Sequence, residues 1–245
     1  MILFSDFDKT LFFQDDEQKT RNNIESIKKW RSENNQFCIT TGRSYKSVTK
    51  KFPEIVEVSD YYIVDSGSII LSKNGGVLGI FYFDPAIVAE IVDFSKKISE
   101  VPVIYYFTPD SENADYKTEN VTKLRLWFED ASLLANVAEQ IERLFPVFAF
   151  KLDAGMPSDK ALAGKKGFVE IIPIGLGKSN AIKFLQREKM IPFEDIVVVG
   201  DGFNDYEMIH EFDGFAIDNS ELANAYKELK TISSLSSLVE LFGGF

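Results

Sequence analysis

The sequence is poor in the residues that several common kinds of functional site require. Among its 245 residues there is one cysteine, Cys38, and one histidine, His210. An intramolecular disulfide bond is therefore impossible, and the absence of C-x-x-C, paired histidines and H-E-x-x-H argues against a zinc site. Nothing marks His210 as catalytic, and a helix-surface position is expected for it. Cys38 lies in the apolar run FCIT and is interpreted as a small buried side chain.

Positive charge and long apolar runs are also scarce. The chain has 27 Lys and Arg against 38 Asp and Glu, for a formal net charge of -11. Nucleic acids and anionic membranes attract basic surfaces, so neither is an expected partner. No apolar run approaches the roughly 18 residues of a membrane span, and the N-terminus lacks a secretory apolar segment, so the cytoplasm is the expected compartment. Small anionic substrates respond to local charge and are not excluded.

Short apolar runs near both ends of the chain predict buried strands. They are MILFS (1–5), QFCIT (36–40), YYIVDS (61–66), DIVVVGD (195–201) and GFAID (214–218). Amphipathic segments lie between several of them, as at 20–34, where apolar residues recur at helical spacing. Buried strands that alternate with helices are typical of a parallel sheet in an α/β fold.

The middle of the chain has a different pattern. Two amphipathic helices are predicted at 84–98 and 131–145, and the remaining segments alternate or run apolar as strands do. The predicted strands lie at 101–107, 122–130, 147–153 and 167–174. Residues 84–172 are therefore expected to form an antiparallel α+β domain inserted into an α/β core of residues 1–83 and 173–245.

Two carboxylates follow the first predicted strand. Asp6 and Asp8 in DFDKT are separated by one residue, and residues i and i+2 of a strand point the same way. Such a pair repels unless a cation lies beside it. Taken alone, the stretch is equally compatible with a pair that caps a helix or turn.

Two further motifs contain the residue types of a phosphate site. Thr41, Gly42 and Arg43 in ITTGRS follow the second predicted strand, where a hydroxyl and a short loop opening a helix can hold a phosphate. A plain strand-to-helix turn with a Ser/Thr cap explains the same residues. Lys178 in GLGKSNAI opens a predicted helix, a position unfavourable for a cation unless an anion is bound nearby. The alternative is a surface lysine.

The last motif is VVVGDGFNDYEM at 197–208. An apolar strand leads to Asp201, and Asn204 and Asp205 follow beside Gly202. Acidic side chains with neighbouring glycines at a strand end are candidates for a site that binds a hard cation. In open α/β sheets, such sites gather at the carboxyl ends of the strands, where all four motifs are expected.

In this order, the four motifs resemble those of the haloacid dehalogenase-like (HAD) phosphatases. DFDKT matches the DxDx[T/V] motif, TTGR the second, Lys178 the third and GDGFNDYEM the GDxxND motif. The insert resembles in position and content the C2B cap of subfamily IIB, the Cof-type and sucrose-phosphatase-like members. The chain departs from them by having Lys9 where glycine is common. It also has DSGS at 65–68 where many Cof-type members have Asn-Gly.

The resemblance implies a Rossmann-like parallel-sheet core with an inserted α+β C2B-type cap, and it implies catalytic roles. Asp6 is the expected nucleophile, which forms an aspartyl-phosphate, and Asp8 the expected general acid and base. Lys178 is expected to pair with Asp6 and to stabilise transition-state charge. Mg²⁺ is the expected cofactor, held by Asp6, the backbone carbonyl of Asp8 and Asp201. Asp205 is expected to ligate the ion or to orient its waters.

Substrate contacts are implied on both parts of the chain. Thr41, Gly42 and Arg43 are expected to bind substrate through its phosphoryl group, and Asn204 to touch the phosphate or the leaving group. In the insert, residues of alternating strands are candidates for leaving-group contacts, although a solvated face is the more common explanation for such residues. The candidates are Lys123 and Arg125, then Lys151, Asp153 and Glu170, with Trp127 on the face of the first two.

The function predicted from these features is Mg²⁺-dependent hydrolysis of a small phosphomonoester, namely a sugar phosphate. The expected partner is a small phosphorylated metabolite. One alternative is a phosphotransferase or phosphomutase acting on sugar phosphates, because phosphomannomutases share this core and cap type. Another is a non-catalytic binding protein, against which the intact set of Asp6, Asp8, Lys178 and Asp201 argues.

Overall fold

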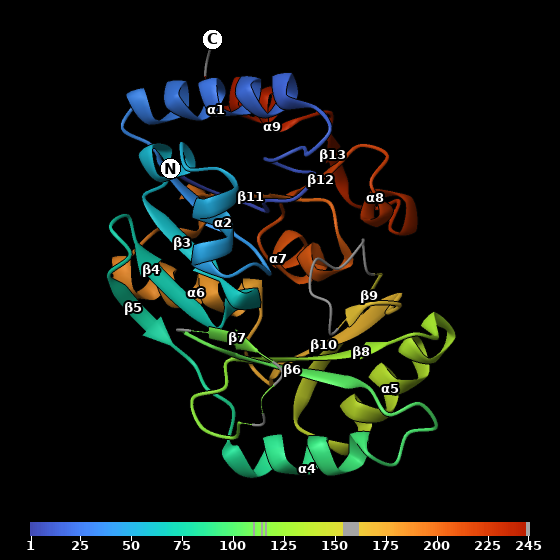
Figure 1. Ribbon diagram of the computed structural model, residues 1–245. Coiled ribbons are helices and arrows are strands. Elements are labelled where there is room, and N and C mark those ends of the chain that lie inside the picture. The colour runs from blue at the N-terminus through green and yellow to red at the C-terminus, as the bar shows by residue number, and fades with distance from the viewer. Residues whose placement is uncertain (110, 114, 116, 154–161, 244–245) are drawn as a thin grey trace. The chain divides into compact units, whose positions relative to one another are not determined.

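A computed structural model describes residues 1–109, 111–113, 115, 117–153 and 162–243 (Figure 1). The chain divides into two compact units. The first consists of Met1–Gly79 and Gly177–Phe245, and the second of Ile80–Leu176. We propose that the second unit is the inserted domain predicted at 84–172.

The first unit is built around a mixed sheet with helices on both faces. Among the described residues the strand order is β13-β12-β11-β1-β2-β3-β4-β5. Its strands are β1 (Ile2–Ser5), β2 (Gln36–Thr40), β3 (Tyr61–Val64), β4 (Ile69–Ser72), β5 (Val77–Ile80), which ends at the boundary of the unit, β11 (Ile196–Gly200), β12 (Phe215–Ile217) and β13 (Lys230–Ile232). Its α-helices are α1 (Glu17–Ser32), α2 (Tyr45–Lys51), α3 (Ile55–Val58), α6 (Lys178–Lys189), α7 (Tyr206–Glu211), α8 (Glu221–Ala225) and α9 (Leu235–Phe242). Short 3₁₀ turns are η1 (Asp65–Gly67), η4 (Phe193–Asp195) and η5 (Phe203–Asp205).

The five strands predicted in this unit are present, and they run parallel. β1 lies between β2 and β11, with Ile2 opposite both Gln36 and Ile196. All four residues of β1 are buried, as expected for a strand covered on both faces. In Figure 1, α1 and α9 lie on one side of this sheet and α6 and α7 on the other. The α/β fold class with a parallel central sheet is confirmed.

Strands that the sequence analysis did not predict complete this sheet. β4 pairs antiparallel with β3, with Val64 opposite Ile69, and β5 lies beyond β4 at one edge. β13 forms the other edge and pairs with β12. These strands are only three or four residues long. β5 and β13 also lack fully buried positions, so the apolar patterns of these two are weak.

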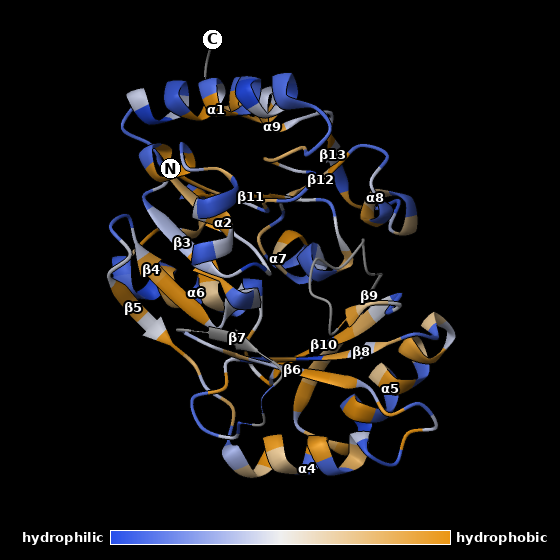
Figure 2. Ribbon diagram, viewed as in Figure 1, coloured by the Kyte–Doolittle hydropathy of each residue, from blue (hydrophilic) through white to orange (hydrophobic). Residues whose placement is uncertain are grey.

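Helix α1 shows how the sequence places the covering helices. The Asp16 side chain accepts a hydrogen bond from the Lys19 amide at 2.9 Å and so caps the first turn. The apolar stripe of α1, including Ile24, Ile27 and Trp30, is buried. Figure 2 shows hydrophobic colour along β4 and β6, whereas α1 is largely hydrophilic.

The second unit contains an antiparallel sheet of order β7-β6-β8-β10-β9 among the described residues. Its strands are β6 (Val103–Thr108), β7 (Ser111–Asn113), β8 (Lys123–Phe128), β9 (Val147–Asp153) and β10 (Gly167–Pro173). Its helices are α4 (Pro85–Ser95), α5 (Leu134–Leu144) and the 3₁₀ turn η2 (Ala131–Leu133). The predicted helices and strands of the insert are thus present, and β7 is an addition.

The two faces of this second sheet differ in character. One packs against α4 and α5 in an aliphatic core that includes Leu126 of β8, Val88 of α4 and Ile141 of α5. The other face carries a smaller, mainly aromatic cluster, consisting of Tyr105, Phe107, Trp127, Leu162 and Phe168. The alternation along β8 therefore separates an apolar core from a face that mixes charge with aromatic rings.

None of the helices in the described part of the chain has both the length and the apolar character needed to cross a membrane.

Candidate active site

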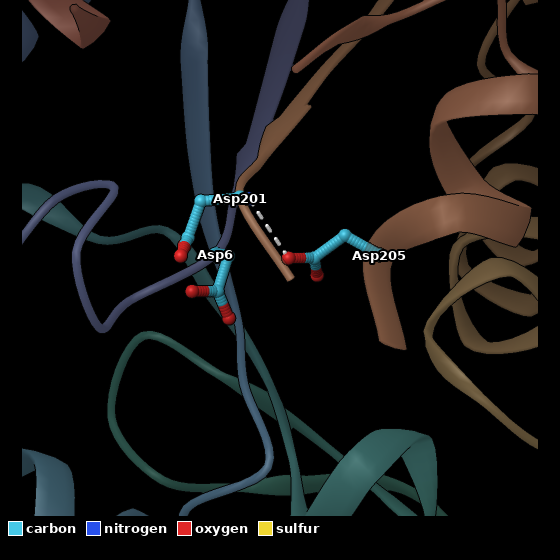
Figure 3. A group of neighbouring side chains, drawn as sticks. All are labelled: Asp6, Asp201 and Asp205. Atoms are coloured by element: carbon cyan, nitrogen blue, oxygen red, sulfur yellow. Dashed lines mark hydrogen bonds between the residues drawn. The ribbon is translucent and has the colours of Figure 1, made fainter. Parts of the chain in front are cut away.

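Three carboxylates meet at the carboxyl ends of β1 and β11. Asp6 directly follows β1, and its amide donates to the Val199 carbonyl at 2.9 Å. Asp201 directly follows β11, and Asp205 ends the 3₁₀ turn η5. One oxygen from each carboxylate lies within 4.8 Å of one from the other two (Figure 3). Parallel pairing of β1 with β11 therefore brings residues at opposite ends of the chain into one cluster.

Lys178 is the cation of this cluster. Its Nζ lies 2.5 Å from Asp6 Oδ1 and 2.5 Å from Asp205 Oδ1, and its side chain is almost completely buried. Lys178 is the first residue of α6, the position at which a cation meets the positive end of the helix dipole. Two carboxylates compensate for that unfavourable position, which explains how the helix can begin with lysine.

Both carboxylate oxygens of Asp205 accept hydrogen bonds from other groups of the protein. Its Oδ2 accepts hydrogen bonds from the Asp201 and Gly202 amides at 3.0 Å each, while Oδ1 accepts from Lys178. A Cβ at Gly200 would lie 2.4 Å from Asp205 Cγ, so the close approach of this carboxylate requires glycine there. Asp205 thereby fixes the backbone that carries Asp201.

Burial and mutual repulsion set the charge balance of the cluster. Burial raises the pKa of Asp6 well above its ordinary value, Lys178 lowers it, and Asp205 and Asp201 raise it further. Burial and the Asp205 charge raise the pKa of Asp201 to about 6. Burial alone would lower the pKa of Lys178, but Asp205 and Asp6 hold it above its ordinary value. One ammonium faces three carboxylates, so an additional cation would be stabilised here.

The donor set fits Mg²⁺. Asp6 and Asp201 offer carboxylate oxygens, which are the ligands that hard cations prefer, and the described residues place no histidine or cysteine in the cluster. The raised pKa values of both carboxyls have burial as their first cause, and a bound cation would offset that cost.

Asp8 and Arg43 form a bidentate ion pair beside the cluster. Arg43 Nε lies 2.6 Å from Asp8 Oδ2, and Nη2 lies 2.9 Å from Oδ1. Asp8 remains substantially exposed, with 42% of its side-chain surface accessible. Arg43, predicted from the sequence to contact substrate, thus holds the Asp8 carboxylate, and the two parallel bonds fix the orientation of that group.

The other predicted phosphate-site residues lie on loops of the same unit. Thr41 follows β2 and is buried, and its amide donates to the Ile63 carbonyl at 2.8 Å. Its hydroxyl accepts from the Arg43 amide at 3.2 Å. Gly42 lies between them and is partly exposed. Asn204 is partly exposed in η5, between Asp201 and Asp205 in the sequence.

Two residues without a predicted role connect the cluster to helices behind it. The Thr10 hydroxyl donates to Asp201 Oδ1 at 2.8 Å. The Asn23 side-chain amide in α1 donates to the carbonyls of Thr10 and Leu11 at 3.2 and 3.0 Å, and its oxygen accepts from Ser236 in α9. Asn23 is a polar residue on the buried face of α1, a pattern that could have identified it.

We expect replacement of Asn23 by alanine to destabilise the protein and to lower its turnover of a phosphate ester. The Thr10 and Leu11 carbonyls would lose their buried donor, which costs about 1–3 kcal/mol of unfolding free energy. The loop that carries Thr10 would then hold Asp201 less firmly. The matched control is Asn22→Ala, because Asn22 is exposed and its side chain pairs with Gln18. Urea unfolding and turnover of an aryl phosphate measure both effects, and equal behaviour of the two variants would contradict this role.

The two sequence-predicted cations of the insert lie in the second unit and share a carboxylate. Arg125 Nε lies 2.8 Å from Glu170 Oε2, and Lys123 Nζ lies 3.5 Å from the same oxygen. The Lys123 side chain is fully buried, whereas that of Arg125 is 19% exposed. Lys123 lies over the Phe107 ring, and Arg125 lies over the rings of Phe107 and Phe168, which belong with Trp127 to the aromatic cluster of this face.

Four other residues were singled out from the sequence, namely Cys38, His210, Lys151 and Asp153. Cys38 is fully buried, as expected, and burial raises the pKa of its thiol. His210 is exposed on α7, where its ring stacks on Tyr206. Lys151 is exposed on β9, and the side chain of Asp153 lies outside the described part of the structure.

A comparison with protein families finds one whose pattern extends over nearly the whole chain. The model of the haloacid dehalogenase-like hydrolases matches residues 3–111 and 105–234. All four motifs and most of both segments of the first unit fall within these matches.

Individual relatives agree with this match. An uncharacterized protein of Mycoplasma capricolum is 27% identical over 231 residues, covering 86% of this chain and 87% of that protein. The 5-amino-6-(5-phospho-D-ribitylamino)uracil phosphatase YitU of Bacillus subtilis is 23% identical over 244 residues, covering 93% and 89%. The sucrose-phosphatase of Synechocystis, solved with sucrose and phosphate, has a TM-score of 0.68 at 19% identity, covering 100% and 97%. This last likeness is one of fold.

Proposed function

Because this chain belongs to the haloacid dehalogenase-like hydrolases and is a phosphatase of that family, we propose that it hydrolyses a sugar phosphate or a similar small phosphomonoester with Mg²⁺. The reaction proceeds through an aspartyl-phosphate on Asp6. The observation that carries this proposal is the position of Lys178, whose ammonium bridges Asp6 and Asp205 at 2.5 Å each.

In this proposal Asp6 is the nucleophile. One of its oxygens forms a bond to phosphorus as the bond from phosphorus to the leaving alkoxide breaks. Lys178 fixes the direction of the Asp6 carboxylate and opposes the negative charge of the phosphoryl oxygens. Mg²⁺ held by Asp6, the Asp8 carbonyl and Asp201 would neutralise charge on the same oxygens. Asp205, whose oxygens are occupied by protein donors, acts by positioning Asp201 and Lys178.

Asp8 serves as the general acid and then the general base. It gives a proton to the leaving alkoxide and later takes one from the water that attacks the aspartyl-phosphate. For the first step one Asp8 oxygen must carry the proton, which leaves Arg43 a hydrogen bond to the other oxygen. In the second step the carboxylate accepts a proton, and the bidentate contact with Arg43 holds it in that form. Thr41 and the Gly42 amide bind phosphoryl oxygens, and Asn204 contacts the phosphate or the leaving group.

The substrate class is supported by the relatives and by the second unit. The Bacillus relative is a 5-amino-6-(5-phospho-D-ribitylamino)uracil phosphatase, and the Synechocystis protein is a sucrose-phosphatase solved with sucrose and phosphate. Arg125 and Lys123 are the proposed leaving-group contacts in this chain. Of the two, Arg125 is better suited, because part of its guanidinium side chain is exposed whereas Lys123 is fully buried.

A panel of phosphorylated metabolites tests the proposal directly. The purified protein is assayed with each compound for inorganic phosphate, with and without Mg²⁺ after exhaustive chelation, and in the presence of acceptor sugars. Release of phosphate from sugar phosphates only when Mg²⁺ is present supports the proposal. Transfer of the phosphoryl group to an acceptor sugar would identify a phosphotransferase or mutase instead, and no turnover of any compound would favour a binding protein.

We expect Mg²⁺ to raise the melting temperature of the protein, and to do so more at pH 7.5 than at pH 5. The Asp201 pKa of about 6 means that this carboxyl is largely protonated at pH 5, and a proton competes with the metal. At a concentration about 100-fold above Kd, Mg²⁺ should stabilise by about 2.7 kcal/mol, which corresponds to a shift of roughly 5 °C or more.

Asp201 also determines the direction in which the stability of the metal-free protein changes with pH. A carboxyl whose pKa is raised in the folded state costs stability above that pKa, and the cost disappears below the unfolded value. The contribution of Asp201 to stability therefore falls as pH rises from about 4 to about 6. Thermal unfolding with and without Mg²⁺ measures both effects, with Asp201→Asn as the control. A shift of equal size at both pH values, or one retained in Asp201→Asn, would contradict the assignment.

A further inference from the structure

The turn between β3 and β4 has an unusual backbone. Asp65, Ser66 and Gly67 all have positive φ, at 48°, 58° and 100°. This region favours glycine, and two of the three residues are not glycine. Asp65 and Ser66 are also buried, at 2% and 5% exposure. Residues held in such a conformation persist only where the surrounding structure stabilises them.

A tight hairpin explains part of this geometry. The φ values of Ser66 and Gly67 are those of a type I′ turn, and the Ser68 amide donates to the Asp65 carbonyl at 3.2 Å, as such a turn requires. A hairpin alone, however, does not require burial of the turn. It also does not require hydrogen bonds to a different loop.

The turn makes those additional bonds to the loop after β2. The Asp65 amide donates to the Arg43 carbonyl at 2.9 Å, and the Ser66 amide donates to the Thr41 carbonyl at 3.0 Å. Asp65 and Ser66 have positive φ in this arrangement, in which their two successive amides donate hydrogen bonds to the same loop. The backbone of the proposed phosphoryl-binding residues is therefore anchored by this turn.

On its other side the turn touches the start of α6. A Cβ at Gly67 would lie 2.4 Å from the carbonyl oxygen of Gly177 and 2.5 Å from its carbonyl carbon. Gly177 directly precedes Lys178, and its carbonyl accepts the Ala181 amide at 3.1 Å in the first turn of the helix. Any side chain at Gly67 must therefore displace the backbone from which Lys178 projects.

We infer that the turn Asp65–Gly67 is a positioning element for catalysis, which holds the Thr41–Arg43 loop and the N-terminus of α6 at a fixed separation. It sets the place of Lys178 relative to Thr41 without touching the substrate itself. This inference rests on the proposed function, because it concerns groups that would surround the phosphoryl group. A misplacement of about 1 Å at such groups can reduce turnover about 100-fold.

The test compares Gly67→Ala with Gly75→Ala. Gly75 also has positive φ, at 74°, in the turn between β4 and β5, so alanine meets a similar backbone penalty at both positions. At Gly75 the three atoms nearest to the new Cβ belong to the Tyr45 side chain, at 3.5–3.6 Å, which is ordinary contact. The control therefore reproduces the strain of the substitution without the collision with Gly177.

The measurements are kcat and KM for p-nitrophenyl phosphate, the inhibition constant of orthovanadate, and the melting temperature, all with Mg²⁺ present. Orthovanadate can adopt the five-coordinate geometry of a phosphoryl group during transfer, and its inhibition constant does not depend on the fraction of folded protein. We expect Gly67→Ala to lower kcat and to weaken orthovanadate binding, each by about tenfold or more. Gly75→Ala should leave both within twofold of wild type at a similar loss of melting temperature.

Equal effects of the two variants, or no effect of Gly67→Ala on orthovanadate, would overturn the positioning role. If Gly67→Ala does not fold, Ser66→Thr compared with Asn34→Thr gives a milder version of the same test. Both positions have positive φ, at 58° and 63°, where a β-branched residue is disfavoured, and Asn34 lies in the exposed turn after α1. A wild-type protein without phosphatase activity would instead overturn the proposed function, and the positioning role with it.

Discussion

Replacing Asp6 by asparagine is expected to abolish phosphomonoester hydrolysis and to leave the protein at least as stable as wild type. The amide cannot attack phosphorus, and loss of a nucleophile of this kind lowers kcat by roughly 10⁴-fold or more. Stability should not suffer, because burial already raises the pKa of Asp6 and makes its charged form costly. Lys178 would keep Asp205 as its partner, so the ammonium would remain compensated.

The measurements are steady-state turnover of p-nitrophenyl phosphate and the melting temperature in metal-free buffer. Asp15→Asn is the matched control, because Asp15 is an exposed carboxylate in the same loop region before α1. That variant should retain both properties. Turnover of Asp6→Asn within tenfold of wild type would exclude Asp6 as the nucleophile, whereas a large loss of melting temperature would show that its charge stabilises the fold.

Replacing Lys178 by methionine should damage both activity and stability. The substitution leaves Asp6 and Asp205 buried without their common cation, and loss of one partner from a buried ion pair costs about 3–5 kcal/mol. Activity should fall by roughly 10²–10³-fold, the usual effect of removing a group that stabilises charge in the transition state. These two losses have the same physical origin, which is the negative charge collected at the ends of β1 and β11.

The stability loss should also depend on pH. Without the ammonium, the contribution that lowers the Asp6 pKa disappears, so this carboxyl retains its proton to a higher pH in the folded state. A raised carboxyl pKa costs stability above that value, so the deficit of Lys178→Met should be larger at pH 8 than at pH 5.

Lys183→Met supplies the control in the same helix. Lys183 is partly exposed and pairs with Glu211 on the surface, an interaction that contributes about 0–1 kcal/mol. Urea unfolding at both pH values and aryl phosphate turnover test the comparison. Similar behaviour of the two methionine variants would contradict the assigned role of Lys178.

Much of the core could be predicted because it depends on local patterns. The apolar runs of β1, β2 and β11 are buried on both faces, so each is recognisable from its own residues. Asp6 and Asp201 lie directly after such runs, and parallel pairing then places them at one edge of the sheet. Lys178 was recognisable because a lysine at a helix start is unfavourable without an anionic partner.

The features that were missed depend on contacts distant in sequence. The two hydrogen bonds that Arg43 donates to Asp8 join residues 35 positions apart, and no local pattern indicates them. Lys123 is fully buried, where it pairs with Glu170 on a neighbouring strand and lies over the Phe107 ring. The pattern of its own strand favoured a solvent-exposed position. β4 is only four residues long, although three of them are buried, and β5 has no buried residue, so neither was assigned as a strand from its own residues.

One departure from the family pattern has a structural basis. Lys9 has φ of 60°, in the left-handed region where glycine is favoured. The exposed lysine therefore has a backbone conformation that glycine adopts most easily, which explains why glycine is common at this position in the family. Its amide donates to the Phe12 carbonyl at 2.8 Å, and its charge lowers the pKa of Asp201, although other effects dominate there.

The central place of β1 has a consequence for synthesis on the ribosome. β1 is made first, but one of its two neighbours in the sheet is β11, with residues 2–5 opposite residues 196–199. At about 5–20 residues per second, roughly 10–40 seconds separate the emergence of these two strands. During that interval one edge of an apolar strand has no partner, and exposed edges of this kind promote aggregation. The nascent first unit should therefore depend on chaperone protection until β11 emerges, whereas the antiparallel strands of the second unit, which are close in sequence, can pair earlier.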